Sequence, residues 1–290
     1  MKFGVMFANT GHGSTTEGAG AIARAAEAGG FNTLWTVEHV LVPSGYESKY
    51  PYDQSGKMAG GAEVFDLPDP LMWLAFVAGQ TSRIRLGTGV LILPQRNVPI
   101  VAKEIATLDH LSGGRVTLGV GAGWLAEEFA ALGVPFEDRG ARLDEHIDAL
   151  RELWSPSGDP EKSTFHGKFV DFTDCISRPR PANGTVPIVI GGHTKPAARR
   201  AARRGDAFIP GSGTIEELSA AFGAMEAECA VIGRDPSEIE RYAMAGGKPG
   251  PGLDQRVEQL AEIGVSEVVI PAFRPDTLAD IGTDLVTRYG

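Results

Sequence analysis

The sequence predicts a single α/β domain, residues 1–290, folded as one (β/α)8 TIM barrel. Short apolar runs alternate with amphipathic segments along the whole chain, which is typical of a parallel sheet with helices between its strands. Eight such pairs can be counted, and 290 residues is an ordinary length for a one-domain barrel. A doubly wound sheet is the alternative, but residues 119–124 place Trp124 where the third glycine of a dinucleotide fingerprint belongs.

The predicted elements follow one another at regular intervals along the chain. The predicted strands cover residues 2–7, 33–38, 84–91, 115–120, 187–190, 206–210, 239–244 and 266–270. The predicted helices cover residues 15–29, 69–80, 98–111, 137–154, 195–204, 214–232, 253–263 and 275–288. The first helix illustrates the reasoning, because alanines and Ile22 recur at helical spacing before the stop signal Gly29-Gly30.

The second strand ends in the most informative pair of residues, Glu38 and His39. The β-branched and aromatic run from Thr33 favours a strand, so consecutive side chains at its end point to opposite faces. α/β barrels keep their chemistry at the carboxyl ends of parallel strands, and a histidine changes charge near neutral pH. We therefore predict that Glu38 and His39 are catalytic. The alternative is a histidine that only caps a neighbouring carbonyl group.

Two connections are much longer than the links of about 2–6 residues that usually join strands and helices. Residues 41–68 follow the acid–histidine pair and are predicted to form a lid over a substrate, although a plain surface insertion is the alternative. Three of the five tyrosines lie in this segment, Tyr46, Tyr50 and Tyr52. Residues 155–185 precede the fifth strand and include a predicted hairpin at 164–172. They lie on the side away from the predicted site, so we expect a structural role.

Glycines interrupt the third and fourth strands near their carboxyl ends, where buried strands normally carry bulky side chains. Gly87 and Gly89 lie in the third strand, and the fourth runs into Gly121 and Gly123. A flat ring stacked on the backbone would explain this opening, and so would tight packing inside the barrel. The residues alone leave both explanations open.

The fifth strand runs into Gly191 and Gly192 immediately before a helix. Such a turn exposes backbone N–H groups at the positive end of the helix dipole, which favours binding of an anion. His193 and Lys195 can add further donors. A tight turn in which Thr194 simply caps the helix is the alternative.

Charge and cysteine usage argue against several classes of function. The formal net charge of −10 disfavours nucleic acid and anionic membranes as partners, because both need clustered basic charge. No apolar stretch approaches the roughly 18 residues of a membrane span, and the start lacks a signal-peptide pattern, so we expect a cytoplasmic protein. Cys175 and Cys229 lie far apart and the histidines show no ligand spacing, so no disulfide or metal site is expected.

Four segments together resemble the bacterial luciferase-like family of flavin and deazaflavin oxidoreductases. They are WTVEHV, LGTGVLILPQRN, residues 107–154 from TLDHLSGGRV to RELW, and IVIGGHTKPAARRAARRGDAFIP. The resemblance covers nearly the whole chain and is closest to the branch that uses coenzyme F420, with PQRN and GWLAEEF as the more specific signals. It implies a TIM barrel, which agrees with the independent count of repeats.

The resemblance also implies roles for individual residues. Glu38 and His39 would lie beside the tricyclic ring of the cofactor. The bulge of the third strand, which in this family often carries a non-prolyl cis peptide, would lie against the back face of that ring. The Gly191-Gly192 turn would hold the phosphate-bearing tail. The expected cofactor contacts are therefore Thr88, Gly89, Val90, Glu127, Gly191, Gly192 and His193.

One departure from the family concerns the substrate. The sugar-6-phosphate dehydrogenase branch places a catalytic glutamate directly after the fourth-strand glycines, where this chain has Trp124. Together with the lid tyrosines, Trp124 favours a planar or apolar small-molecule substrate. We predict a homodimeric, F420-dependent oxidoreductase that transfers a hydride, with His39 as proton donor or acceptor. The alternatives are an FMN-dependent monooxygenase that uses reduced flavin and oxygen, and a non-catalytic cofactor-binding barrel.

Overall fold

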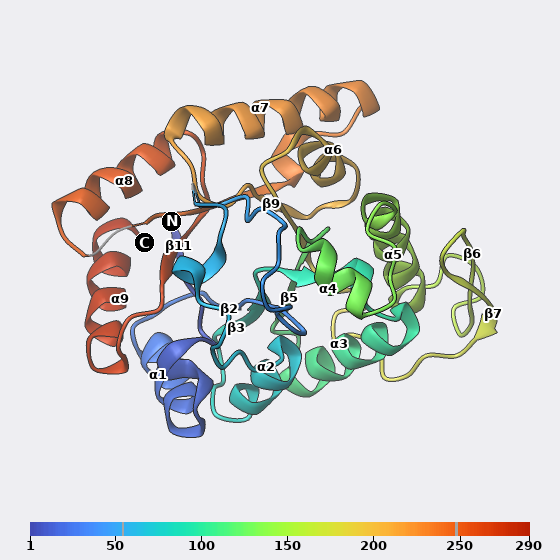
Figure 1. The fold of residues 1–290 in the computed structure, drawn as a ribbon, viewed down its shortest axis with the longest axis horizontal. Helices are drawn as coiled ribbons and strands as arrows, with labels where there is room; N and C mark the ends of the chain where they lie inside the picture. Colours follow the sequence, from blue (N-terminus) through green and yellow to red (C-terminus); the bar gives the residue numbers. More distant parts are fainter. Residues whose placement is uncertain (54, 247–248) are drawn as a thin grey trace.

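The computed structural model describes residues 1–53, 55–246 and 249–290. Eight parallel strands of this part of the chain form a closed barrel, which confirms the predicted fold class (Figure 1). In order around the barrel they are β1 (Lys2–Met6), β2 (Thr33–Thr36), β3 (Arg85–Thr88), β5 (Val116–Gly121), β8 (Ile188–Gly191), β9 (Ala207–Ile209), β10 (Glu240–Met244) and β11 (Glu267–Pro271). Strand β11 pairs with β1 and closes the ring.

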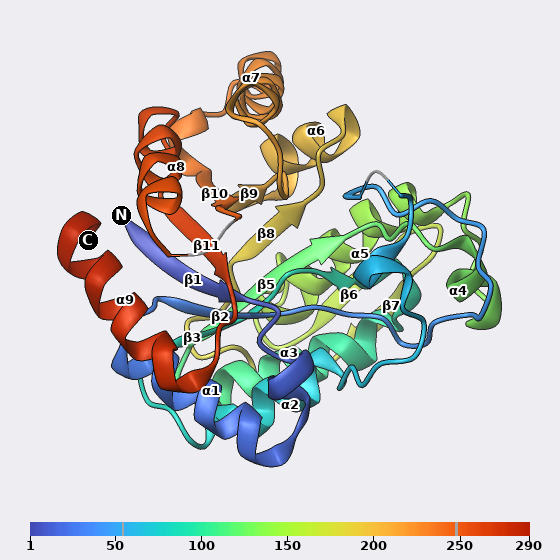
Figure 2. The same ribbon diagram turned by 60° about the vertical axis from the view of Figure 1, so that its left-hand side comes forward.

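Helices cover the outside of the barrel, as Figure 2 shows. They are α1 (Thr16–Ala28), α2 (Pro70–Ala78), α3 (Val98–Ser112), α4 (Ala126–Ala131), α5 (Arg139–Trp154), α6 (Lys195–Arg204), α7 (Ile215–Ile232), α8 (Pro251–Glu262) and α9 (Pro275–Tyr289). Short 3-10 turns add η1 (Gly11–Ser14), η2 (Met58–Gly61), η3 (Leu93–Gln95) and η4 (Pro236–Glu238). The sequence patterns do not predict α4, because six residues give too little periodicity for detection.

The barrel interior explains one of the strand glycines. The indole of Trp35 is fully buried, and its Nε1–H donates to the buried carboxylate of Glu267 at 3.0 Å. A Cβ atom added at Gly87 would lie 2.5 Å from this indole, and one added at Gly4 would lie 2.7 Å from it. Tight packing around Trp35 therefore accounts for Gly87.

Two strands differ from the prediction by more than one residue at an end. Strand β2 ends at Thr36 rather than at residue 38, because the N–H of Val37 donates to the Asn9 side chain at 2.9 Å and not to a neighbouring strand. The predicted third strand is divided into β3 and a two-residue strand, β4 (Leu91–Ile92), which pairs with the end of β5. A cis peptide bond joins Gly89 and Val90 in the break.

The insertion before β8 forms the predicted hairpin. Strand β6 (Ser163–His166) runs antiparallel to β7 (Asp171–Cys175), and the pair extends beyond α5 at the edge of the molecule (Figure 1). The Glu145 carboxylate on α5 accepts hydrogen bonds from the N–H groups of Lys168, Phe169 and Val170 in the hairpin turn. These contacts attach the hairpin to the outside of the barrel.

Several features that bear on function class can be checked directly. None of the helices in the described ranges is both long and apolar enough to cross a bilayer. The same ranges contain no group of three or more His, Cys, Asp or Glu side chains that could hold a metal ion. Cys229 is buried and Cys175 is exposed, and both are free thiols.

Candidate active site

His39 is paired with a carboxylate at the mouth of the barrel, the end where the strands have their carboxyl termini. Its Nδ1 lies 3.0 Å from Oε2 of Glu128, the third residue of α4, and the Glu128 side chain is fully buried. The other oxygen, Oε1, accepts hydrogen bonds from the N–H groups of Val40 (2.7 Å) and Leu41 (3.3 Å). A carboxylate held in this way fixes the imidazole ring and leaves Nε2 as its second functional nitrogen.

Glu38 points away from His39 and forms an ion pair with Arg96. The Glu38 side chain is 1% exposed, and it also accepts a hydrogen bond from the N–H of Ile92. Arg96 Nη2 lies 2.9 Å from Oδ2 of Asp69 as well. Burial raises the pKa of the Glu38 carboxyl, and the Arg96 guanidinium opposes that rise. The pair joins the end of β2 to η3, so the predicted contact of Glu38 with a cofactor ring stays a prediction.

Glu127 binds the lid, the segment of residues 41–68. Its Oε1 accepts hydrogen bonds from the N–H groups of Glu47 (2.7 Å) and Ser48 (3.0 Å). The Ser48 hydroxyl, together with these N–H groups, holds the pKa of Glu127 at about 2, so this side chain stays ionised near neutral pH. Its Oε2 is buried without a hydrogen-bond partner in the described chain. The predicted polar contact of Glu127 with a cofactor remains a prediction.

Aromatic rings form a continuous chain across the mouth. Edge-to-face contacts with centroids 5.2–5.7 Å apart join His39 to Trp124, Trp124 to Tyr46 and Tyr50, Tyr50 to Tyr52, and Tyr52 to His193. Such pairs stabilise by about 0.5–1.5 kcal/mol beyond their buried area. The structure thus brings all three lid tyrosines together with the predicted residues that follow β2, β5 and β8. The lid lies over the mouth of the barrel.

The Val90 side chain, which follows the Gly89-Val90 cis peptide bond, lies against two other strand ends. A Cβ atom added at Gly121 would lie 2.6 Å from Val90 Cγ2, and one added at Gly191 would lie 2.5 Å from Val90 Cγ1. The Thr88 hydroxyl donates to the carbonyl of Gly119 at 2.7 Å and thereby joins the end of β3 to β5. Gly121 and Gly191 therefore make room for Val90, which no sequence pattern indicates.

Not every N–H group of the glycine turn after β8 is free to bind an anion. Gly192 has φ +122°, a conformation that L side chains rarely adopt, and its N–H donates to the carbonyl of Ile209 at 3.1 Å. Thr194 accepts a hydrogen bond from the N–H of Ala197 at 3.4 Å and caps α6. The capping role is therefore real, and an anion site would depend on the remaining donors, including the exposed Lys195.

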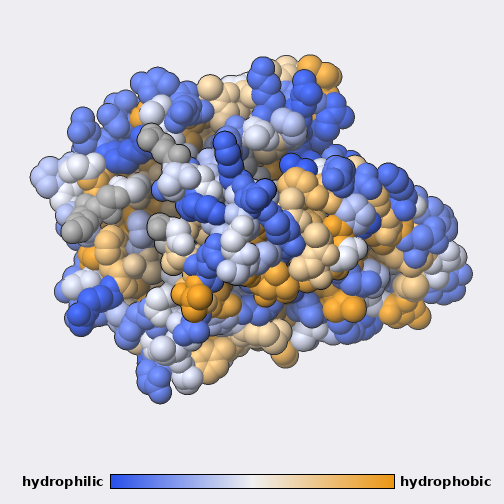
Figure 3. Space-filling view, viewed as in Figure 1, coloured by the Kyte–Doolittle hydropathy of each residue, from blue (hydrophilic) through white to orange (hydrophobic). Residues whose placement is uncertain are grey.

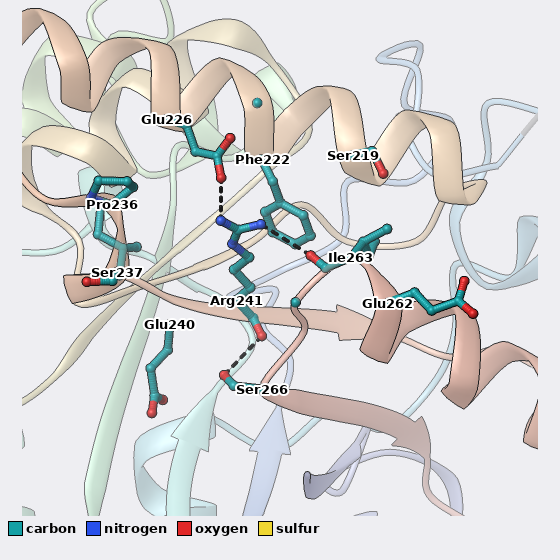
Figure 4. Close-up of a pocket in the computed structure, with 13 residues that line it drawn as sticks. Ser219, Phe222, Glu226, Pro236, Ser237, Glu240, Arg241, Glu262, Ile263 and Ser266 are labelled. Atoms are coloured by element: carbon teal, nitrogen blue, oxygen red, sulfur yellow. Dashed lines mark hydrogen bonds and ion pairs between the residues drawn. The ribbon is translucent and has the colours of Figure 1, made fainter.

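A surface pocket of about 650 Å³ lies at the opposite end of the barrel (Figure 4). It is lined by residues of α7 and η4, by the amino-terminal end of β10, and by residues between 262 and 266, which precede β11. Arg241 crosses it and is already bound, because it pairs with Glu226 and its Nη1 donates to the carbonyl of Ile263 at 3.2 Å. In barrels of this class chemistry is placed at the carboxyl ends of the strands, so we assign the site to the mouth.

Two partners of the predicted site residues were not foreseen from the sequence, Glu128 and Arg96. Both lie in segments that the sequence marks as distinctive, GWLAEEF and PQRN. The two consecutive acids after the fourth strand, Glu127 and Glu128, are the signal that could have indicated Glu128. Adjacent residues of a helix point in directions about 100° apart, so the two carboxylates must have different partners. Arg96 follows the strand next to β2, where a counter-charge for Glu38 is expected.

Comparisons of sequence place this chain among known proteins. The family model described as luciferase-like monooxygenase matches residues 1–249. An uncharacterized protein of Mycobacterium tuberculosis is 32% identical over 290 residues, with 99% of this chain and 97% of that protein covered. The F420-dependent glucose-6-phosphate dehydrogenase of Amycolatopsis mediterranei is 34% identical over 197 residues, which cover 67% of this chain and 53% of that enzyme.

Two solved structures share the fold. The monooxygenase RslO1 of Streptomyces bottropensis has a TM-score of 0.77 and 20% identity, with 100% of both chains covered. The coenzyme F420-dependent tetrahydromethanopterin reductase of Methanopyrus kandleri has a TM-score of 0.77 and 16% identity, with 100% of this chain and 99% of that chain covered. The barrel is thus common to both kinds of enzyme. With the family model matched over most of its length, the chain belongs to the luciferase-like monooxygenase family.

Proposed function

We propose that the protein is a coenzyme F420-dependent oxidoreductase that transfers a hydride between the deazaflavin and a small planar or apolar substrate. The observation that carries this proposal is the His39–Glu128 pair, a fixed proton-transfer group at the mouth of the barrel beside Trp124. Family membership supports an oxidoreductase. A relative and a structural neighbour that are named as F420-dependent support the choice of cofactor.

The residues at the mouth fit such a cofactor. A Cβ atom added at Gly192 would lie 3.2 Å from the Ala197 side chain, so glycine brings this turn close to the start of α6. Together with His193 and Lys195 at the start of α6, this turn would hold an anionic tail. Gly89 and Val90 would contact the ring. When bound, the deazaflavin supplies a carbon that donates or accepts a hydride.

His39 would move the proton that accompanies hydride transfer. The Glu128 carboxylate accepts from Nδ1–H, so Nε2 is the nitrogen that can exchange a proton with a substrate oxygen or nitrogen. The imidazole side chain is only 10% exposed, which limits competition from water. Glu38 and Arg96 hold the end of β2 in place, so we assign them a positioning role.

The substrate class follows from the rings that line the mouth. Trp124 contacts His39, Tyr46 and Tyr50, and by the family resemblance it takes the position of the catalytic glutamate of the sugar-6-phosphate dehydrogenase branch. That position therefore carries no acid for catalysis on a sugar phosphate and offers an aromatic surface instead. A flat or apolar substrate would bury its faces against these rings.

Binding titrations test the cofactor. We expect F420 to bind with a Kd well below that for FMN, followed by the absorbance or fluorescence of each cofactor. Equal or reversed affinities would contradict the proposal and favour the second candidate, an FMN-dependent monooxygenase, which the family model and the RslO1 fold support. Substrate-dependent oxidation or reduction of bound F420 would exclude the remaining alternative, a barrel that only binds the cofactor.

We also propose that the chain forms a homodimer through α2. This helix has no charged residue, yet its Met72 is 60% and its Phe76 45% exposed, and Ile100 on neighbouring α3 is 60% exposed. Figure 3 shows apolar side chains on this part of the surface. A helix that is apolar all round is normally buried. Two copies that each carry a net charge of −10 meet most favourably at a face without carboxylates.

Light scattering tests the dimer. The protein should have twice the chain mass, and replacing Met72 and Phe76 together with glutamate should reduce it to the monomer mass without loss of the far-UV CD spectrum. A wild-type monomer, or a double variant that stays dimeric, would contradict this interface.

A further inference from the structure

We propose that α4 couples closure of the lid to the orientation of His39, with Glu127 and Glu128 as its two contacts. The proposal rests on the assignment of His39 as the proton-transfer group. It adds that His39 is held ready for transfer only when the lid is closed over the mouth. Glu127 and Glu128 are both positioning residues in this proposal.

The first contact is a reciprocal pair of interactions between the lid and the first turn of α4. Glu127 accepts hydrogen bonds from the N–H groups of Glu47 and Ser48 in the lid. In return, the Ser48 hydroxyl oxygen accepts a hydrogen bond from the N–H of Ala126 at 3.1 Å. Leu125, at the N-cap position, has no side-chain cap of its own. The lid therefore supplies the N-cap of α4 from a distant part of the chain.

The second contact lies where the lid leaves β2. Glu128 accepts hydrogen bonds from the N–H groups of Val40 and Leu41, and its other oxygen contacts His39. The same short helix thus holds the lid at its start and again six residues later, at Glu47. Glu127 and Glu128 are adjacent and point in different directions because consecutive helical residues differ by about 100°.

The coupling follows from the marginal stability of a short helix. Helix α4 has six residues, and isolated helices shorter than about 12 residues are marginal in water. Opening the lid would remove the Ser48 cap and both hydrogen bonds to Glu127. The first turn of α4 would then loosen, and the Glu128 carboxylate would no longer hold His39 in one orientation. Closure would restore the cap and the pairing together, at the moment when water is excluded.

Two variants of the ligand-free protein test this proposal. Ser48→Ala removes the cap, and Glu127→Ala removes the acceptor of the lid N–H groups. Loss of a helix cap raises the opening equilibrium by roughly twofold to thirtyfold. We expect amide hydrogen exchange to accelerate by that factor in residues 126–131 as well as in residues 45–48. NMR of the histidine ring nitrogens should show that His39 changes from one tautomer to a mixture.

Glu63→Ala is the matched control. Glu63 also accepts hydrogen bonds within the lid, from the Gly45 N–H at 3.0 Å and the Ser44 hydroxyl at 2.9 Å, but none from α4. Its loss should accelerate exchange near residue 45 and leave α4 and His39 unchanged.

Three results would overturn the coupling. They are faster lid exchange with unchanged α4 and His39 in the two test variants, unchanged exchange everywhere, or an equal effect of the control on α4. None of these measurements uses a cofactor, so their outcome is independent of whether the protein binds F420 or FMN.

Discussion

The Nδ1 atom of His39 lies 3.0 Å from Oε2 of Glu128, although 89 positions separate the two residues in the chain. The carboxylate is fully buried and the imidazole nearly so. Because burial strengthens a charge-assisted hydrogen bond, this contact fixes the ring more firmly than a surface pair would. The arrangement decides which nitrogen of His39 faces the mouth.

His39→Ala should lower turnover by about a hundredfold to ten-thousandfold, the range that a positioned proton-transfer group contributes. The affinity for cofactor should stay within about twofold of the parent. Single-turnover hydride transfer and the melting temperature, measured together, separate this role from a structural one. If His39 only caps the strand end, the melting temperature falls and turnover per folded molecule is unchanged.

Glu128→Gln should lower turnover by roughly tenfold to a thousandfold while F420 affinity is kept, because the amide no longer selects one tautomer of His39. The pH profile of turnover should shift as well. Glu145→Gln is the matched control, since Glu145 also accepts backbone N–H groups but lies at the distant hairpin. An unchanged pH profile and rate in Glu128→Gln would remove Glu128 from the mechanism.

Glu38→Gln should destabilise the fold by about 1–3 kcal/mol, because Arg96 loses its buried counter-charge and keeps only the partly exposed Asp69. The double variant Glu38→Gln, Arg96→Met should recover part of this loss. Urea unfolding of the single and double variants measures both effects. A stable single variant with altered cofactor affinity would instead support the role that the family resemblance implies for Glu38.

Glu27 should make stability depend on pH in the acid range. Burial alone would raise the pKa of Glu27. Hydrogen bonds from the N–H groups of Ile84, Arg83 and Ser82 nevertheless bring this pKa down from its usual 4.5 to about 2. A lowered pKa means that the stabilisation is present above about pH 4.5 and is lost as the pH falls toward 2.

The variant Glu27→Gln tests that dependence. It should be less stable than the parent by about 1 kcal/mol at pH 7, after allowance for solvent screening of a partly exposed group. Thermal unfolding from pH 7 to pH 2.5 should show the difference shrinking as the pH falls. A difference that is constant across this range would assign the loss to packing rather than to charge.

Gly191→Ala should weaken cofactor binding, but through Val90 rather than through the turn alone. The added Cβ atom would lie 2.5 Å from Val90 Cγ1, so the Val90 side chain must move. Adding Val90→Ala should restore space, so in an F420 titration the double variant should bind as tightly as the single variant Val90→Ala. If the double variant binds more weakly than Val90→Ala alone, the loss comes from the turn and its N–H groups.

Local sequence was sufficient for the fold class and for most separate parts of the site, but not for α4 or for the break between β3 and β4. The eight strands follow from the alternation of apolar runs and helical patterns. The apolar content and periodicity of a segment can be read from that segment alone. The positions of His39, Trp124 and the lid tyrosines at one end of the barrel follow from that topology. Their order along the chain already assigns them to the carboxyl ends of strands or to the loops that follow.

Only the tertiary structure decided which of these parts meet. Glu128 rather than Glu127 contacts His39, Arg96 neutralises Glu38, and Val90 fills the space that Gly121 and Gly191 leave. Each contact joins residues that are far apart in the sequence, and their spacing along the chain does not indicate that they meet. Barrel closure brings the strand ends together, and the rotation of α4 then selects one of two identical side chains, because adjacent helical positions face in directions about 100° apart.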